Sequence, residues 1–268
     1  MSRVETGQIT SKDGTTIVFD RTGEGPPLIL VGGALNNRAS GAPYAEPLAP
    51  SFTVYTYDRR GRGDSGDTQP YAVEREVEDL GALIAEAGES ALLFGHSSGA
   101  ALVLETAARI GGIVKIALYE PPYNVDDTRA PVPDDYVAHL DELVAQDRRG
   151  DAVEYFMVVG VGMPQDAVTP MRGAPFWPSL EAVAHTIAYD GRAMGFDKPD
   201  RSLPVERWKT ITAPALVMDG NASPDWSRNA VQAVTDALPN AERRTLAGQT
   251  HEVDPAVLAP VLVEFFEG

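Results

Sequence analysis

The sequence predicts an α/β protein with a mostly parallel central β-sheet that helices cover on both sides. Short apolar runs of strand length alternate with segments of helical periodicity. This alternation is typical of parallel sheets, because each parallel strand needs a crossover connection to the next. One long segment between two of the strands carries helical patterns only. We therefore predict a sheet-based core with an inserted group of helices.

Most of the predicted strands are apolar or β-branched runs bounded by turn residues. Helical periodicity is clearest at 73–87, where apolar residues recur at intervals of four and three. Further helices are expected behind the stretch at 91–100, from about residue 226 and at the end of the chain. The predicted strands are residues 15–20, 28–33, 52–57, 91–94, 115–119, 214–219 and 243–246.

The character of the chain changes after Pro122. Residues 123–205 carry helical patterns broken by prolines and no convincing buried strand. We predict that this segment forms a helical cap over the carboxyl edge of the sheet. Residues 1–122 and 206–268 would then form the core.

The cap holds several methionine and aromatic side chains, Phe176 and Trp177 among them. Such side chains can line an adaptable apolar substrate pocket. They can equally well pack the cap onto the core. The sequence leaves both interpretations open.

Composition and charge narrow the classes of function. A formal net charge of -17 argues against nucleic acid and anionic membranes as partners, because both would repel the protein. The lack of cysteine excludes disulfides and a thiol nucleophile, and no spacing of ligand residues indicates a metal. The N-terminal residues lack the apolar stretch of a secretion signal. We expect a cytoplasmic monomer or homodimer that acts on a small molecule without a cofactor.

The stretch ALLFGHSSGA, residues 91–100, carries the candidate nucleophile. It places Gly95-x-Ser97-x-Gly99 where a buried strand turns into a helix. A serine at so sharp a turn leaves no room for side chains two positions away on either side, which accounts for the two glycines. Ser97 is therefore a candidate nucleophile. The N–H of Ser98, at the start of the helix, is a candidate donor to an oxyanion.

Two other stretches supply partners for this serine. The first buried strand leaves through Gly33, and the N–H of Ala34 behind it is a candidate second oxyanion donor. His251 lies between the last strand and the last helix, on the same edge of the sheet as Ser97, and is the candidate base. His96 neighbours the nucleophile and is expected to shape the turn or the pocket.

A glycine-rich segment at 58–65 reads DRRGRGDS. With Gly66 it matches the G-x-G-x-x-G spacing of a dinucleotide site. Such a site must open a helix, whereas this segment runs on to Pro70 before any helical pattern begins. We interpret it as a charged turn.

Together these motifs resemble the α/β-hydrolase fold superfamily, and the resemblance spans the whole chain. The glycine exit of the first buried strand matches the oxyanion loop, although the histidine that often opens that loop is absent. DRRGRGDS matches the Asp-x-x-Gly-x-Gly-x-Ser turn of the family, and the insertion lies where the family carries a cap. The resemblance implies that Ser97 is the nucleophile and His251 the base. The amides of Ala34 and Ser98 would form the oxyanion hole.

The sequence departs from the family at the triad acid. The usual position, three residues after Gly220, is Ser223, which cannot be anionic. Asp225 lies close by, but a serine followed by proline is typical of a helix start, where Asp225 would be an ordinary first-turn acid. Glu120 ends the strand after the elbow, where some members of the family carry their acid, and Pro121 favours an extended backbone there. Glu120 is preferred, with Asp225 as the alternative.

We therefore predict a serine hydrolase that cleaves a carboxylic ester or lactone of a small, partly apolar substrate through an acyl-enzyme. Thioester and carbon–carbon bond cleavage would use the same residues. The displaced acid motivates a second hypothesis, a non-hydrolytic protein of this fold. Such a protein would bind a ligand, or act as a lyase or cyclase with His251 as base.

Overall fold

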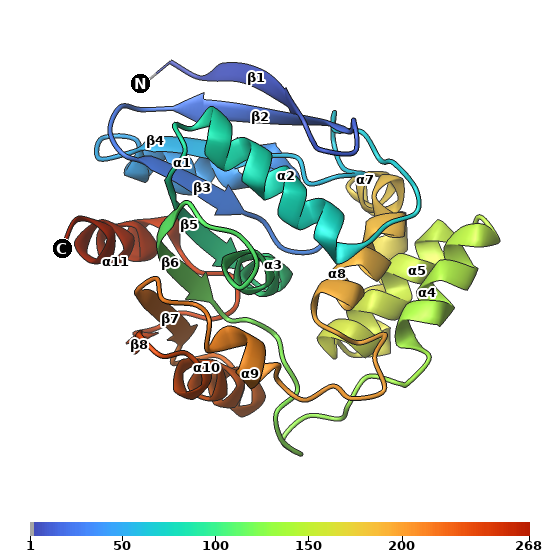
Figure 1. Ribbon diagram of the computed structural model, residues 1–268. Helices are drawn as coiled ribbons and strands as arrows, with labels where there is room; N and C mark the ends of the chain where they lie inside the picture. The colour runs from blue at the N-terminus through green and yellow to red at the C-terminus, as the bar shows by residue number, and fades with distance from the viewer. Residues whose placement is uncertain (1–2) are drawn as a thin grey trace.

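The computed structural model describes residues 3–268 and shows an eight-stranded sheet with helices on both faces (Figure 1). The strand order across the sheet is β1-β2-β4-β3-β5-β6-β7-β8. The strands are β1 (Glu5–Thr10), β2 (Thr16–Thr22), β3 (Pro27–Val31), β4 (Thr53–Tyr57), β5 (Ala91–His96), β6 (Ile113–Tyr119), β7 (Ala215–Gly220) and β8 (Ala241–Leu246).

The sheet is parallel except at one side. Antiparallel pairs join β1 to β2 and β2 to β4, and the other neighbouring strands pair in parallel. The carboxyl ends of β3 to β8 therefore meet at one edge of the sheet. This confirms the predicted mostly parallel sheet, with β1 as a strand that the sequence did not indicate.

Five helices cover the two faces of the core. Side chains of β5 alternate between these faces: Leu93 packs on one, and Leu92 and Phe94 pack on the other, as expected for a strand buried on both sides. Helices α2 (Val73–Glu86), α3 (Ser98–Ala107) and α10 (Asp225–Ala237) cover one face, and α1 (Ala42–Leu48) and α11 (Pro255–Glu267) cover the other.

Between β6 and β7 the described chain is helical and has an apolar core of its own. Helix α8 contacts both α2 and α3 in the core, and Figure 1 shows it at the junction. The last helix of this segment, at 205–208, also lies against the core: Trp208 packs in the core cluster, and Arg207 forms an ion pair with Glu105 of α3. Among residues 3–268 no helix is both long and apolar enough to cross a membrane. The inserted helices are α4 (Tyr136–Ala145), α5 (Arg149–Tyr155), the π-helix η2 (Phe156–Val161), α6 (Gln165–Val168), α7 (Trp177–Ala182), α8 (Ile187–Ala193) and α9 (Val205–Trp208), with 3-10 helices η3 (Thr169–Gly173) and η4 (Ala184–Thr186); a further 3-10 helix, η1 (Arg38–Gly41), precedes α1.

Candidate active site

Ser97 is the single residue between the end of β5, at His96, and the start of α3, at Ser98. Its backbone has φ 57° and ψ -127°, a conformation that residues other than glycine rarely adopt. The glycines around it are sterically required: a Cβ on Gly95 would lie 2.6 Å from Cα of Ala100, and one on Gly99 would overlap the carbonyl oxygen of Val31. The strained turn is therefore held in place by close backbone packing against β3 and α3.

The exit of β3 lies directly beside this turn. A Cβ on Gly33 would lie 3.5 Å from Oγ of Ser97, so the Gly33–Ala34 peptide borders the serine side chain. On the other side, Ser98 is the first residue of α3, where backbone N–H groups are free and the helix dipole is positive. The backbone segments that carry the two candidate oxyanion donors thus both border Ser97.

The imidazole of His251 lies in the loop between β8 and α11 and pairs with Glu120. Nδ1 of His251 is 2.8 Å from Oε2 of Glu120, which lies at the end of β6. Because a carboxylate only accepts, Nδ1 carries the proton in this pair and Nε2 is left to accept one. The Glu120 side chain is 1% exposed and that of His251 is 40% exposed. A buried carboxylate thus orients an imidazole that is partly exposed.

Three donors converge on the Glu120 carboxylate. Oε1 accepts hydrogen bonds from the amide of Gly220, at 3.0 Å, and from the hydroxyl of Ser223. Burial opposes ionisation of this group, but the bonds from His251, Ser223 and Gly220 outweigh it and hold the pKa of Glu120 below its usual value. Ser223 lies at the position where the family usually carries its acid. Here its hydroxyl donates to Glu120, which follows the neighbouring strand β6.

Asp225 lies away from this pair. It is the first residue of α10, its side chain is 71% exposed, and it forms an ion pair with Arg228. This is the placement of a first-turn helix acid. The structure brings Glu120 to His251 and leaves Asp225 at the surface. The extended backbone expected at Glu120 is wrong, because its φ of 46° lies in the left-handed region and the chain turns there as it leaves β6.

The backbone of the His251 loop is held by side chains from the core. Nε2 of His96 is 2.9 Å from the carbonyl oxygen of His251, and the two imidazole centroids are 4.9 Å apart. The hydroxyl of Tyr119 donates to the carbonyl of Thr250 at 2.6 Å. Burial, and then the neighbouring His251, lower the pKa of His96 to about 4, so its neutral ring donates to the loop.

The two aromatic residues proposed from the cap have different surroundings. Phe176 is 49% exposed. Trp177 is buried in the apolar core of the cap, and its Nε1 donates to Glu181 at 3.0 Å. Both are near one end of α7, and the contacts of Trp177 are those of a packing residue within the cap.

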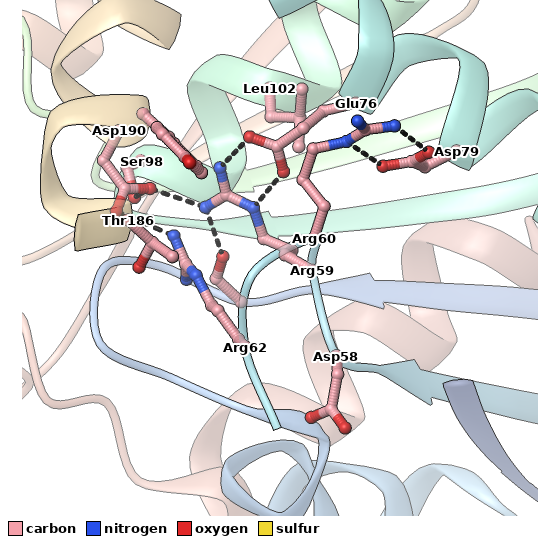
Figure 2. A network of polar contacts seen from close by, with 12 residues as sticks. Asp58, Arg59, Arg60, Arg62, Glu76, Asp79, Ser98, Leu102, Thr186 and Asp190 are labelled. Atoms are coloured by element: carbon pink, nitrogen blue, oxygen red, sulfur yellow. Dashed lines mark hydrogen bonds and ion pairs between the residues drawn. The ribbon is translucent and has the colours of Figure 1, made fainter. Parts of the chain in front are cut away.

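The DRRGRGDS segment is a turn built on three buried arginines, as Figure 2 shows. Arg59 and Arg60 pair with Glu76 and Asp79 of α2. Arg62 reaches into the cap. The segment leads from β4 to α2 without opening a helix, in agreement with a charged turn. Sequence reasoning did not single out Arg62, which borders the site, or its cap partner Asp190.

Comparisons with known proteins bear on the family and the fold. A model of the alpha/beta hydrolase family matches residues 28–261. The crystal structure of an alpha/beta hydrolase from Sphaerobacter thermophilus is 58% identical, with a TM-score of 0.90 over 97% of this chain and 100% of that one. An esterase from Exiguobacterium antarcticum shares the fold at 18% identity, with a TM-score of 0.74 over 97% and 99% of the two chains.

One curated relative is similar over part of its length. The N-formylmaleamate deformylase of Pseudomonas putida is 35% identical over 112 residues, which are 40% of this chain and 42% of the relative. The chain thus matches less than half the length of this relative. Because the family model spans most of the sequence and the fold agrees over nearly the whole chain, the protein belongs to the alpha/beta hydrolase family.

Proposed function

We propose that this protein is a serine hydrolase that cleaves a carboxylic ester or lactone of a small, partly apolar substrate through an acyl-enzyme. The observation that carries the proposal is the 2.8 Å contact between His251 and a buried, ionised Glu120 beside the Ser97 turn. A base oriented by a carboxylate is what a serine needs to become a nucleophile.

In this proposal Oγ of Ser97 attacks the carbonyl carbon, and Nε2 of His251 takes the hydroxyl proton. The amides of Ala34 and Ser98 donate to the oxygen that becomes negative. The tetrahedral intermediate collapses, and His251 returns the proton to the departing alcohol. Water then attacks the acyl-enzyme by the same route and releases the acid.

Glu120 acts through the imidazole. Its carboxylate keeps the proton on Nδ1 of His251 and stabilises the imidazolium that forms in each half of the reaction. Ser223 and Gly220 hold this carboxylate, so a serine at the family's usual acid position is compatible with catalysis. The displaced acid, which motivates the hypothesis of a non-hydrolytic protein, is thus compatible with hydrolysis as well.

A second candidate is hydrolysis of an N-formyl amide. It is favoured by the partial match to N-formylmaleamate deformylase. Ser97 would attack the formyl carbon with His251 as base, and the leaving group would be an amine or amide in place of the alcohol.

The test is a turnover screen of short-chain esters, lactones and N-formyl amides, comparing wild type with Ser97→Ala. We expect turnover of at least one ester or lactone that the variant lacks. Turnover of N-formyl amides alone would favour the second candidate. A ligand that raises the melting temperature without being consumed, with all substrates untouched, would support a binding protein instead.

A further inference from the structure

One carboxylate of the cap is buried against the nucleophile turn. Asp190, in α8, is 1% exposed. Its Oδ1 accepts from Nη1 of Arg59 at 2.6 Å and from Oγ of Ser98 at 2.8 Å, and its Oδ2 accepts from Nη2 of Arg62 at 2.8 Å (Figure 2). Its three donors belong to the core. Through Asp190, the inserted helices therefore bind residues that lie next to Ser97.

Arg62 connects Asp190 to the loop that follows β3. Its Nη1 donates to the carbonyl oxygen of Gly33 at 2.6 Å. That carbonyl and the N–H of Ala34 belong to one planar peptide, so a bond that fixes the carbonyl also fixes the direction of the N–H. A charged donor on the carbonyl also polarises the N–H at the other end of the peptide.

The second oxyanion donor is held by the same carboxylate. Ser98 supplies its amide to the site and its hydroxyl to Asp190. Burial opposes ionisation of Asp190, but Arg62 and Arg59 outweigh it and hold the pKa of Asp190 below its usual value. The charge needed to hold both donors is therefore present at neutral pH.

We propose that Arg62 and Asp190 are positioning residues for the oxyanion hole: Asp190 orients Arg62 and Ser98, and Arg62 orients the peptide that carries the Ala34 N–H. The inference rests on the proposed function. It makes the docking of α8 a condition for rapid catalysis, because the carboxylate comes from the cap and the two donors from the core.

The same turn contains a matched control. Arg60 is as buried as Arg62 and also pairs with a buried carboxylate, that of Asp79. Its other partners are Asp13 and the carbonyl of Arg75, so its hydrogen bonds do not reach the exit of β3, the Ser97 turn or the cap. Arg60→Lys thus loses a comparable bidentate ion pair without disturbing the oxyanion donors.

The experiment measures kcat, KM and melting temperature for wild type, Arg62→Lys and Arg60→Lys on an ester that the wild type hydrolyses. It also measures inhibition by phenylboronic acid, whose serine adduct places an oxygen where the oxyanion forms. A lysine at position 62 can reach Gly33 or Asp190 but cannot bridge them. We expect kcat to fall about tenfold or more, KM to change little, and phenylboronic acid to bind more weakly by a similar factor. Arg60→Lys should lose similar thermal stability and keep kcat within about twofold.

Equal kcat values for the two variants, or an effect of Arg62→Lys on KM alone, would overturn the inference and leave the proposed function standing. A folded wild type that hydrolyses nothing would overturn both. If Arg62→Lys does not fold, Ser98→Ala decides: it keeps the amide and loses the bond to Asp190. An unchanged kcat in that variant would overturn the inference, and a fall of about threefold or more would support it.

Discussion

A single carboxylate, that of Glu120, determines what His251 can do. It is almost fully buried, it faces Nδ1 of His251, and donors from the β7 end of the sheet hold its other oxygen. An uncompensated buried charge would be costly, so these donors are what allow it to stay ionised. The imidazole thereby keeps the tautomer in which Nε2 can accept a proton.

Replacing Glu120 by glutamine should lower kcat by about 10³–10⁴-fold with little change in KM, because an amide can present an N–H to Nδ1 and favour the wrong tautomer. Steady-state kinetics on the best ester would measure this. Asp225→Asn is the control and should keep kcat within about twofold. The reverse pattern would show that the acid has been assigned to the wrong residue.

His96 makes stability depend on pH. Its folded-state pKa of about 4 lies below the usual value, since burial disfavours the charged ring. The unfolded chain therefore binds more protons than the folded one between roughly pH 6.5 and 4. The contribution of His96 is fully present above this window and is lost as the pH falls through it.

Urea unfolding at pH 7.5 and pH 4.5 checks this for wild type and His96→Gln. We expect the free energy of unfolding of the variant to depend less on pH, by about 2–3 kcal/mol between the two values. His139→Asn, on α4, serves as control. A pH dependence identical in wild type and His96→Gln would contradict the account.

At the scale of elements, the turn between β5 and α3 depends on backbone contact with β3. Gly99→Ala should lower the free energy of unfolding by about 2–4 kcal/mol, because the new methyl group overlaps the carbonyl of Val31. Gly111→Ala is matched to it, since a Cβ there meets no atom within 4 Å. Chemical unfolding of both variants tests the point, and equal stabilities would contradict it.

The sequence could predict elements whose pattern is local. Buried parallel strands such as β3, β5 and β7 are continuous apolar runs, so the sequence indicates them directly. In contrast, β1 is an edge strand with exposed and half-buried residues and no apolar run. Helix α1 contains Pro43 and Pro47, which hide its pattern.

The candidate site divides in the same way. Ser97 and His251 stand in recognisable local settings, and so they could be named from the sequence. The choice between Glu120 and Asp225 depends on which strand end faces the imidazole, which spacing alone leaves open. No local sequence pattern marks Asp190 as part of the site, because its contacts join a cap helix to a turn far away in the sequence.

At the scale of the whole molecule, the catalytic edge is assembled from two units that meet across buried ion pairs. Arg59 and Arg62 of the core and Asp190 of the cap are all at most 2% exposed. Breaking such a group leaves an unpaired buried charge, so the cap is held in one position relative to the nucleophile turn. The inserted helices thus contribute a buried carboxylate to the surroundings of Ser97.

The activation of Ser97 can be read directly from the intact mass of the protein after treatment with a fluorophosphonate, for wild type and Ser97→Ala. If Ser97 is activated by His251 and Glu120, wild type gains one adduct and the variant none. Folded wild type that gains no adduct, with a smaller sulfonyl fluoride failing as well, would contradict the account.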